Sequence, residues 1–106
     1  MTPELHRGDI WWADVPGDTV RPVVVLTRER FVDRLNAVLV APVTTTVRDI
    51  PTELPLGPDD GLPQPCAANF DNLFTLRRQR FQRFIASLGP HRHDELCIAY
   101  RFAVGC

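Results

Sequence analysis

The sequence contains no lysine, so all twelve of its basic residues are arginines. The net charge is only −1, and this balance does not by itself indicate a chain that binds nucleic acid through bulk positive charge. Arginine presents a planar fork of donors that suits phosphate and stacks on bases, whereas lysine is a point charge. Because a GC-rich coding sequence also favours arginine, the positions of the arginines carry more information than their number.

Signals for membranes or for export are also lacking. No apolar run approaches the ~20 residues needed to cross a bilayer, and residues 1–9 have no apolar segment of the signal-peptide type. The three cysteines, Cys66, Cys97 and Cys106, are odd in number and widely spaced, which is not a disulfide framework. We therefore expect a cytoplasmic protein with two thiols in or near the core and one free terminal thiol.

The turn residues divide the chain into short strands within one domain, residues 1–106, because 106 residues are too few for two domains. Apolar alternation and β-branched residues predict strands at 9–15, 21–26, 37–43, 66–76 and 81–88. Residues 52–56 form an edge strand at best, because Pro55 cannot donate to a ladder. The continuous apolar run at 23–26 indicates a strand covered on both faces.

The other segments predict loops and one good helix. Residues 27–36 read as a loop with one helical turn, and residues 57–65 read as a surface loop. Residues 90–104 predict a helix that ends at Gly105. Its apolar stripe contains Leu96, Ala99, Tyr100 and Ala103. The expected fold class is mainly β (α+β), a small, strongly bent antiparallel sheet or barrel with a C-terminal helix.

Three segments together carry a family resemblance. The first reads RGDIWWADV at 7–15 and continues, after a short turn, as RPVVVL at 21–26. The second reads VAPVTTT at 40–46 and is followed by IPTEL at 50–54, and the third is CAANFDNLFTL at 66–76. This combination resembles the MazF/PemK family of toxin endoribonucleases, in which a similar opening strand precedes an Arg-Pro strand and a later strand ends in a threonine run. The resemblance covers essentially the whole chain.

The resemblance implies an SH3-like barrel of the MazF/CcdB type that forms a homodimer, with a cognate antitoxin protein as partner. It also implies sequence-specific, metal-independent cleavage of single-stranded RNA without a cofactor. In that reaction the 2′-hydroxyl attacks the adjacent phosphate and leaves 2′,3′-cyclic phosphate and 5′-hydroxyl ends. The catalytic positions that match the family are Arg21, in the Arg-Pro motif, and Thr44, the first threonine of the run.

The chemistry of Arg21 and Thr44 suits these roles. In-line attack on a phosphodiester places charge on the non-bridging oxygens, which a guanidinium stabilises; because arginine stays protonated, we favour electrostatics over proton transfer. Pro22 restricts Arg21 to extended conformations, and Thr44 can donate to a phosphate oxygen or orient the 2′-hydroxyl. Each has a structural alternative: Arg21 pairs with Asp18 or Asp14, or Thr44 bonds a turn backbone.

Further polar residues are candidates for substrate binding. Asn69 and Asp71 alternate on one predicted strand, where an amide can read a base edge and a carboxylate can orient Arg21; a structural turn is the alternative. Arg77 and Arg78 begin the densest basic stretch, which suits a phosphate-tracking surface, a solvated face or an antitoxin-docking patch. One of Trp11 and Trp12 should be core, and the other can stack on a base. The full set of substrate-binding candidates is Thr45, Thr46, Arg48, Asn69, Asp71, Arg77 and Arg78.

Several other functions fit less well. The residues His91, His93 and Cys97 match no common zinc spacing, so we expect no metal site. A gyrase-poisoning toxin of the same fold relies on an aromatic C-terminal tail, and this chain ends without a tryptophan. A catalytically silent barrel that binds RNA or protein is the remaining alternative, which turnover of a fluorescent RNA would separate from an enzyme. The connection at 15–20 is shorter than in many family members, so their substrate rules do not transfer.

Overall fold

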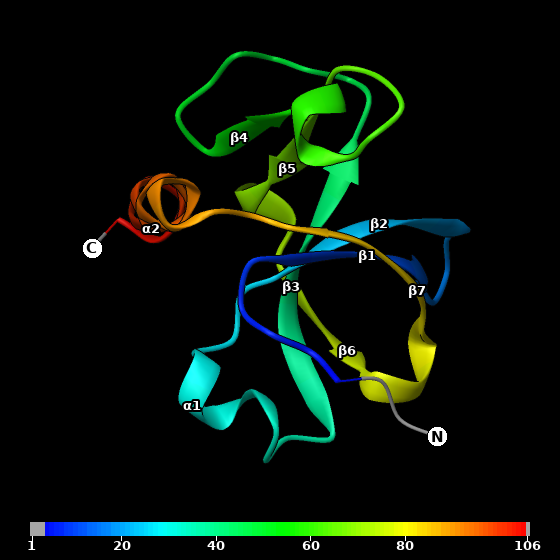
Figure 1. The fold of residues 1–106 in the computed structure, drawn as a ribbon. Helices are drawn as coiled ribbons and strands as arrows, with labels where there is room; N and C mark the ends of the chain where they lie inside the picture. Colours follow the sequence, from blue (N-terminus) through cyan, green and yellow to red (C-terminus); the bar gives the residue numbers. More distant parts are fainter. Residues whose placement is uncertain (1–3, 106) are drawn as a thin grey trace.

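Figure 1 shows a curved antiparallel sheet with the C-terminal helix packed at one side, in a computed structural model that describes residues 4–105. The strands are β1 (Asp9–Asp14), β2 (Val20–Val25), β3 (Ala37–Thr44), β4 (Glu53–Leu56), β5 (Cys66–Asn69), β6 (Phe74–Arg77) and β7 (Phe81–Ser87). The helices are α1 (Glu29–Val32) and α2 (Pro90–Val104). Three short 3-10 turns are η1 (Pro58–Asp60), η2 (Phe70–Asn72) and η3 (Arg78–Arg80).

The sheet runs in the order β4-β5-β3-β2-β1-β7, and β6 pairs with β3. The long strand β3 pairs with β6 at its start, where Ala37 faces Arg77, and with β5 at its end, where Thr44 faces Ala67. The mainly β fold with a C-terminal helix is confirmed. Among residues 4–105 no ladder joins β7 to β4 or β6, so the sheet is strongly curved but not closed into a full barrel.

The hydrophobic core has two parts, one on each face of β2. Val23 and Val25 belong to the cluster inside the curved sheet, whereas Val24 and Leu26 belong to the cluster beneath α2. This arrangement explains why an unbroken apolar run is stable here, since alternate side chains of a strand point to opposite faces. The prediction that residues 23–26 are covered on both faces is confirmed.

Helix α2 has the predicted bounds. Pro90 occupies its first turn, and Gly105 ends it in the left-handed region (φ 74°), where its N–H donates to the Arg101 carbonyl at 2.8 Å. Leu96 and Ala99 are buried as expected. Tyr100 differs from the predicted stripe, because 41% of it is exposed at the mouth of a pocket beside the sheet.

The predicted strand at 66–76 is wrong in the middle, because η2 divides it into β5 and β6. The Asn69 side chain accepts a hydrogen bond from the Asp71 N–H at 2.8 Å, and Phe70 is buried at the break. Asparagine and aspartate favour such local bonds over a ladder. The break allows β5 to pair with the end of β3 and β6 to pair with its start. The strand β4 lies at the edge of the sheet, as Pro55 predicts.

Of the three thiols, Cys66 is buried, Cys97 is half-buried, and Cys106 lies outside the described residues. Burial raises the pKa of the Cys66 thiol above its ordinary value, so this side chain behaves as a small apolar group at neutral pH. Within residues 4–105, no helix combines the length and apolar character that crossing a membrane requires.

Candidate active site

Arg21 lies near the start of β2, in the hairpin that follows β1, with its Cα opposite Ala13. Its Nη2 forms an ion pair with Asp18 Oδ2 at 3.0 Å, which is one of the structural alternatives considered for it. Both side chains are partly exposed (33% and 40%), so solvent weakens this pair. The Nε of Arg21 is buried and has no hydrogen-bond partner among the described residues. The fold therefore uses only part of the hydrogen-bonding capacity of this guanidinium.

Thr44 is the last residue of β3. Its Oγ1 accepts a hydrogen bond from the Thr46 N–H at 3.1 Å, which is the turn-capping role considered as its alternative. That bond uses a lone pair of the hydroxyl, so the hydroxyl proton is available for a second acceptor. The capping bond therefore fixes the side chain without using its donor.

The β2–β3 ladder ends at Val23 and Pro42, two residues short of Arg21 and Thr44. Val23 pairs with Pro42 and Val25 with Val40. Continued toward the start of β2, the same register sets Arg21 opposite Thr44 on one face of the sheet, where neighbouring strands lie about 4.8 Å apart. A cavity lined by both Pro22 and Thr44 agrees with this continuation. The two residues predicted as catalytic from the sequence thus share one edge of the fold.

A small cavity of about 90 Å³ adjoins Thr44. Its walls include Trp12 from β1, Pro22 from β2 and Gln64 from the loop before β5. The volume is well below the ~300 Å³ of typical small-molecule sites, which suits a single ring and not a whole nucleotide. The sequence indicated a tryptophan as a possible stacking residue, but no local pattern pointed to Gln64, which reaches this place through the 57–65 loop.

The three other candidates after β3, Thr45, Thr46 and Arg48, are exposed on the segment that leads from the site. This segment is held by Glu53, a buried carboxylate of β4 that the sequence analysis missed. Glu53 Oε1 accepts from the Arg48 N–H at 2.9 Å, and Glu53 Oε2 accepts from Arg48 Nε at 3.3 Å. The only signal for Glu53 in the sequence is its place in the alternating segment 52–56, where a side chain that points inward is buried.

Asn69 and Asp71 make structural contacts. Asn69 is 5% exposed and caps η2, while the Asp71 carboxylate accepts a hydrogen bond from Thr52 Oγ1 at 2.7 Å. Arg21 forms its ion pair with Asp18. No ion pair between Arg21 and Asp71 is present among the described residues, so Asp71 does not orient Arg21 as expected. Both side chains therefore have the structural role that was considered as the alternative to RNA binding.

Arg77 and Arg78 lie at the opposite end of β3 from Thr44, about 23 Å away along the strand at ~3.3 Å per residue. Arg78 is partly buried against the end of α1, where its Nη1 donates to the Val32 carbonyl at 2.6 Å. Arg80 instead reaches the end of β1 and forms an ion pair with Asp14 at 2.8 Å. The structure therefore does not bring Arg77 and Arg78 to the Arg21–Thr44 edge.

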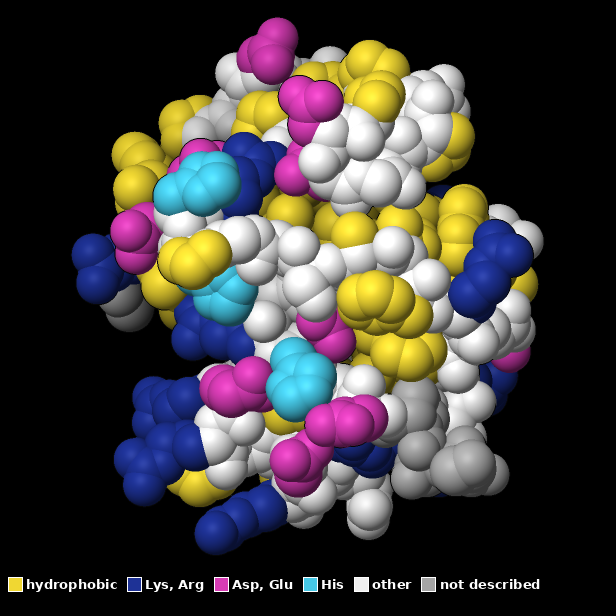
Figure 2. Space-filling model, in the orientation of Figure 1, with side chains coloured by type: hydrophobic (Ala, Val, Ile, Leu, Met, Phe, Trp, Pro, Cys, Tyr) yellow, Lys and Arg dark blue, Asp and Glu magenta, His cyan; other side chains and the backbone are white. Residues whose placement is uncertain are grey.

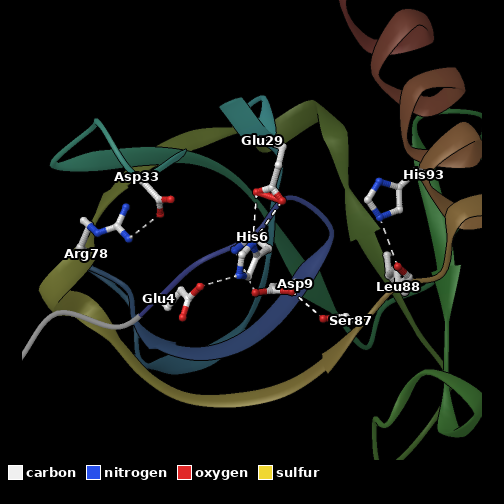
Figure 3. A network of polar contacts seen from close by, with 9 residues as sticks. All are labelled: Glu4, His6, Asp9, Glu29, Asp33, Arg78, Ser87, Leu88 and His93. Atoms are coloured by element: carbon white, nitrogen blue, oxygen red, sulfur yellow. Dashed lines mark hydrogen bonds and ion pairs between the residues drawn. The ribbon is translucent and has the colours of Figure 1, made fainter. Parts of the chain in front are cut away.

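Figure 3 shows a separate polar network around Asp9, the buried aspartate of the opening motif. Its carboxylate accepts from Ser87 Oγ at 2.6 Å and from the His6 N–H at 3.0 Å. The His6 ring points instead to Glu29, at 3.2 Å, and the hydrogen bond to Glu29 raises the pKa of His6. Because the ring does not lie between Ser87 and Asp9, these residues form a structural cap and not a serine nucleophile with its base.

Two of the three residues considered as metal ligands, His93 and Cys97, make other contacts. His93 Nε2 lies 3.2 Å from the Leu88 carbonyl oxygen (Figure 3), and Cys97 Sγ accepts from Arg7 Nη2 at 3.2 Å. In the described part of the chain, no three His, Cys, Asp or Glu side chains are grouped so that they could hold a metal ion.

The structure is a small β-rich protein with Arg21 near the start of β2 and Thr44 at the end of the adjacent strand β3. Residues 6–102 match the family described as PemK-like, MazF-like toxin of type II toxin–antitoxin system, and the chain belongs to this family. The family predicted from the motifs is therefore confirmed.

Similar proteins extend over the full chain. One is "Probable endoribonuclease MazF2" of Mycobacterium tuberculosis, which is 43% identical over 96% of this chain and 100% of its own length. Another is "Probable endoribonuclease MazF5" of the same species, 36% identical over 100% of this chain and 98% of its own. Both relatives are named as endoribonucleases, which is the enzyme class predicted from the sequence.

Solved structures agree with the fold. The M. tuberculosis toxin MazF-mt6 superposes with a TM-score of 0.85 at 37% identity, covering 92% of this chain and 96% of its own. A structure described as an endoribonuclease in complex with its cognate antitoxin, from a mycobacterial species, has a TM-score of 0.83 at 24% identity and covers 96% of each chain. The latter supports the fold alone.

Proposed function

We propose that this chain is an endoribonuclease toxin that cuts single-stranded RNA at specific sequences, in the cytoplasm and without a metal. The observation that carries the proposal is the β2–β3 register, which on continuation past Val23 and Pro42 sets Arg21 opposite Thr44, in a chain whose full-length relatives are named endoribonucleases. The family description supplies the partner, a cognate antitoxin.

In the proposed reaction the 2′-oxygen of the substrate bonds to the adjacent phosphorus, and the bond from phosphorus to the 5′-oxygen breaks. The 2′-hydroxyl proton leaves to solvent, and the departing 5′-oxygen takes up a proton. Arg21 leaves its exposed pairing with Asp18 and donates to the non-bridging oxygens, where negative charge develops. Thr44 donates from the opposite strand and positions the phosphate between the two side chains.

The surroundings of this pair support a sequence preference. We propose that one unstacked base enters the cavity beside Thr44, stacks on Trp12 and meets the Gln64 amide at its edge. Thr45, Thr46 and Arg48 then contact the RNA backbone along the segment that Glu53 holds in place. Single-stranded RNA suits this site because its bases can leave the stack without breaking pairs.

We also propose that the toxin is a homodimer. Helix α2 exposes large apolar side chains, Ile98 at 53% and Phe102 at 61%, which association between copies would cover.

RNA cleavage by the purified protein in excess EDTA tests this function. We expect cleavage at a limited set of sequences in a random RNA library, with mapped ends that carry 2′,3′-cyclic phosphate and 5′-hydroxyl. Cleavage that stops in EDTA and returns with added divalent metal would overturn the metal-independent chemistry. No cleavage of any library member would instead favour a silent binding protein.

Thr44→Ala is expected to lower the single-turnover cleavage rate by about tenfold to a hundredfold, while the affinity for RNA falls less, because the hydroxyl contributes mainly to the transition state. The matched control is Thr45→Ala, the exposed neighbour, which should change the rate much less. Equal losses in both variants would contradict the assignment of Thr44.

A further inference from the structure

The loop at 57–65 connects β4 to β5 and carries Gln64 to the cavity beside Thr44. Its first turn, η1, is closed by bonds of its own. The Asp60 N–H donates to the Gly57 carbonyl at 2.9 Å, and the Gly57 N–H donates to Asp60 Oδ2 at 3.1 Å. These contacts set the shape of η1, but they do not fix where the loop lies on the rest of the molecule.

Arg92 of α2 is the side chain that ties this loop to the helix. Its Nη2 donates to the Pro55 carbonyl, just before the loop, and lies 3.4 Å from Asp60 Oδ2 in η1. Only 18% of the Arg92 side chain and 16% of the Asp60 side chain are exposed, so salt screens this ion pair less than an exposed one. At the upper left of Figure 2, basic and acidic side chains lie next to each other where α2 meets the β4–β5 connection of Figure 1. One guanidinium therefore joins β4, η1 and α2.

The chain between Asp60 and Gln64 is stiff. Leu62 is buried in the cluster beneath α2 and also lines the cavity. Gln64 stands between two prolines: the ring of Pro63 fixes its own φ, and Pro65 restricts Gln64 to extended conformations. Because this stretch has few ways to absorb a displacement, a shift of η1 also moves the Gln64 amide.

We propose that Arg92 is a positioning residue for base selection. It holds η1 against α2, so that Gln64 stays in the wall of the cavity where an unstacked base is read. Arg92 does not line this cavity, so it acts on the RNA through the loop and not by contact. The inference rests on the base-binding cavity proposed above, and it adds a determinant of specificity on the C-terminal helix.

A second ion pair of Arg92 provides a matched control. Its Nη1 donates to Glu95 Oε2 at 2.6 Å, within α2. Glu95→Gln removes that charge, keeps an acceptor for the guanidinium and leaves the contacts with Pro55 and Asp60 in place. Arg92→Gln removes the ion pair with the loop, whereas Arg92→Lys keeps the charge without the planar fork that reaches several acceptors at once.

Amide hydrogen exchange of the free chain tests the contact between Arg92 and the loop without RNA. We expect Arg92→Gln to speed exchange across 57–65 by about tenfold, Arg92→Lys to speed it less, and Glu95→Gln to leave it unchanged. Exchange in β2 and β3 should stay the same in all three variants, which separates release of the loop from a general loss of stability. Unchanged exchange in the loop of Arg92→Gln would overturn the proposal. Asp60→Asn breaks the same ion pair from the loop side and keeps the test valid if Arg92→Gln does not fold.

Single-turnover cleavage of a random RNA library tests the role in base selection. The base position that the cavity reads is the one at which Gln64→Ala relaxes the preference. At that position we expect Arg92→Gln to lower the ratio of rates between the preferred base and the others by about tenfold, while Glu95→Gln keeps the ratio. Preferences at other positions should not change. Gln64→Ala combined with Arg92→Gln should relax the preference no further than Gln64→Ala alone, because both substitutions act through one contact.

The outcomes separate this inference from the function on which it rests. An equal loss of cleavage over all sequences in Arg92→Gln, or additive effects of the two substitutions, would show a purely structural role and overturn the inference alone. If Gln64→Ala changes no preference, the base-binding cavity fails and base selection by Arg92 fails with it, while the ribonuclease function stands. If the unmodified chain cleaves no library member, the ribonuclease function fails, and the role of Arg92 in base selection is overturned with it.

Discussion

Replacing Arg21 by alanine is expected to reduce RNA cleavage by a hundredfold or more, with folding unchanged. Loss of one preorganised donor to a developing oxyanion typically costs 10²–10³ in kcat, or about 2.7–4 kcal/mol. In the folded protein Arg21 contributes only a partly exposed ion pair with Asp18, which stabilises the fold weakly. Single-turnover cleavage and thermal unfolding, measured on the same preparation, separate the two contributions.

Two further variants distinguish catalysis by Arg21 from its pairing with Asp18. Arg21→Lys keeps the charge but loses the planar fork, so we expect cleavage between that of the unmodified chain and that of Arg21→Ala. Asp18→Asn removes the ion pair and leaves Arg21 in place, so cleavage should persist. An Asp18→Asn protein as inactive as Arg21→Ala, or an active Arg21→Ala protein, would contradict the proposed role.

Gly8→Ala is expected to destabilise the fold by about 2 kcal/mol or more. Gly8 has a φ of 87°, in the left-handed region that costs other residues roughly 1–2 kcal/mol. A Cβ at Gly8 would also lie 2.6 Å from His93 Nε2, so the imidazole ring of His93, on α2, must move. Chemical denaturation with linear extrapolation gives the difference in the free energy of unfolding.

The turn before β2 provides a matched control for Gly8. Gly17 has a φ of 77°, but nothing lies within 4 Å of a Cβ built there. Gly17→Ala therefore carries the backbone cost without the collision, and it should destabilise less than Gly8→Ala. Adding His93→Ala to Gly8→Ala removes the collision, so the double variant should lose less stability than the two single losses combined. Equal effects of Gly8→Ala and Gly17→Ala would show that the ring yields freely.

The sequence predicted what local chemistry determines. The apolar run at 23–26, the glycine at the end of α2 and the proline in β4 each report on their own surroundings, and all three were interpreted correctly. The family motifs pointed to Arg21 and Thr44, and the β2–β3 register sets them opposite each other only when it is continued two residues past Val23 and Pro42.

The missed features depend on contacts between distant segments. The break at Phe70 is stabilised by an asparagine cap and by burial of the ring, which a strand-like composition hides. Arg78 was grouped with its basic neighbours, yet its donors are taken by carbonyls more than forty residues earlier in the chain. Arg7 looked like part of a strand motif, and only the packing of α2 shows that it lines a pocket.

The strand β2 fixes the spacing between Arg21 and the pocket that Leu26 and Tyr100 border, because it is part of a hydrogen-bonded sheet and cannot stretch. From Arg21 to Leu26 the chain advances by five residues, or about 17 Å at ~3.3 Å per residue. An extended peptide needs roughly five or six residues to cover that span. A single extended ligand that reaches from Arg21 to this pocket must therefore be at least that long, and a shorter one occupies one place or the other.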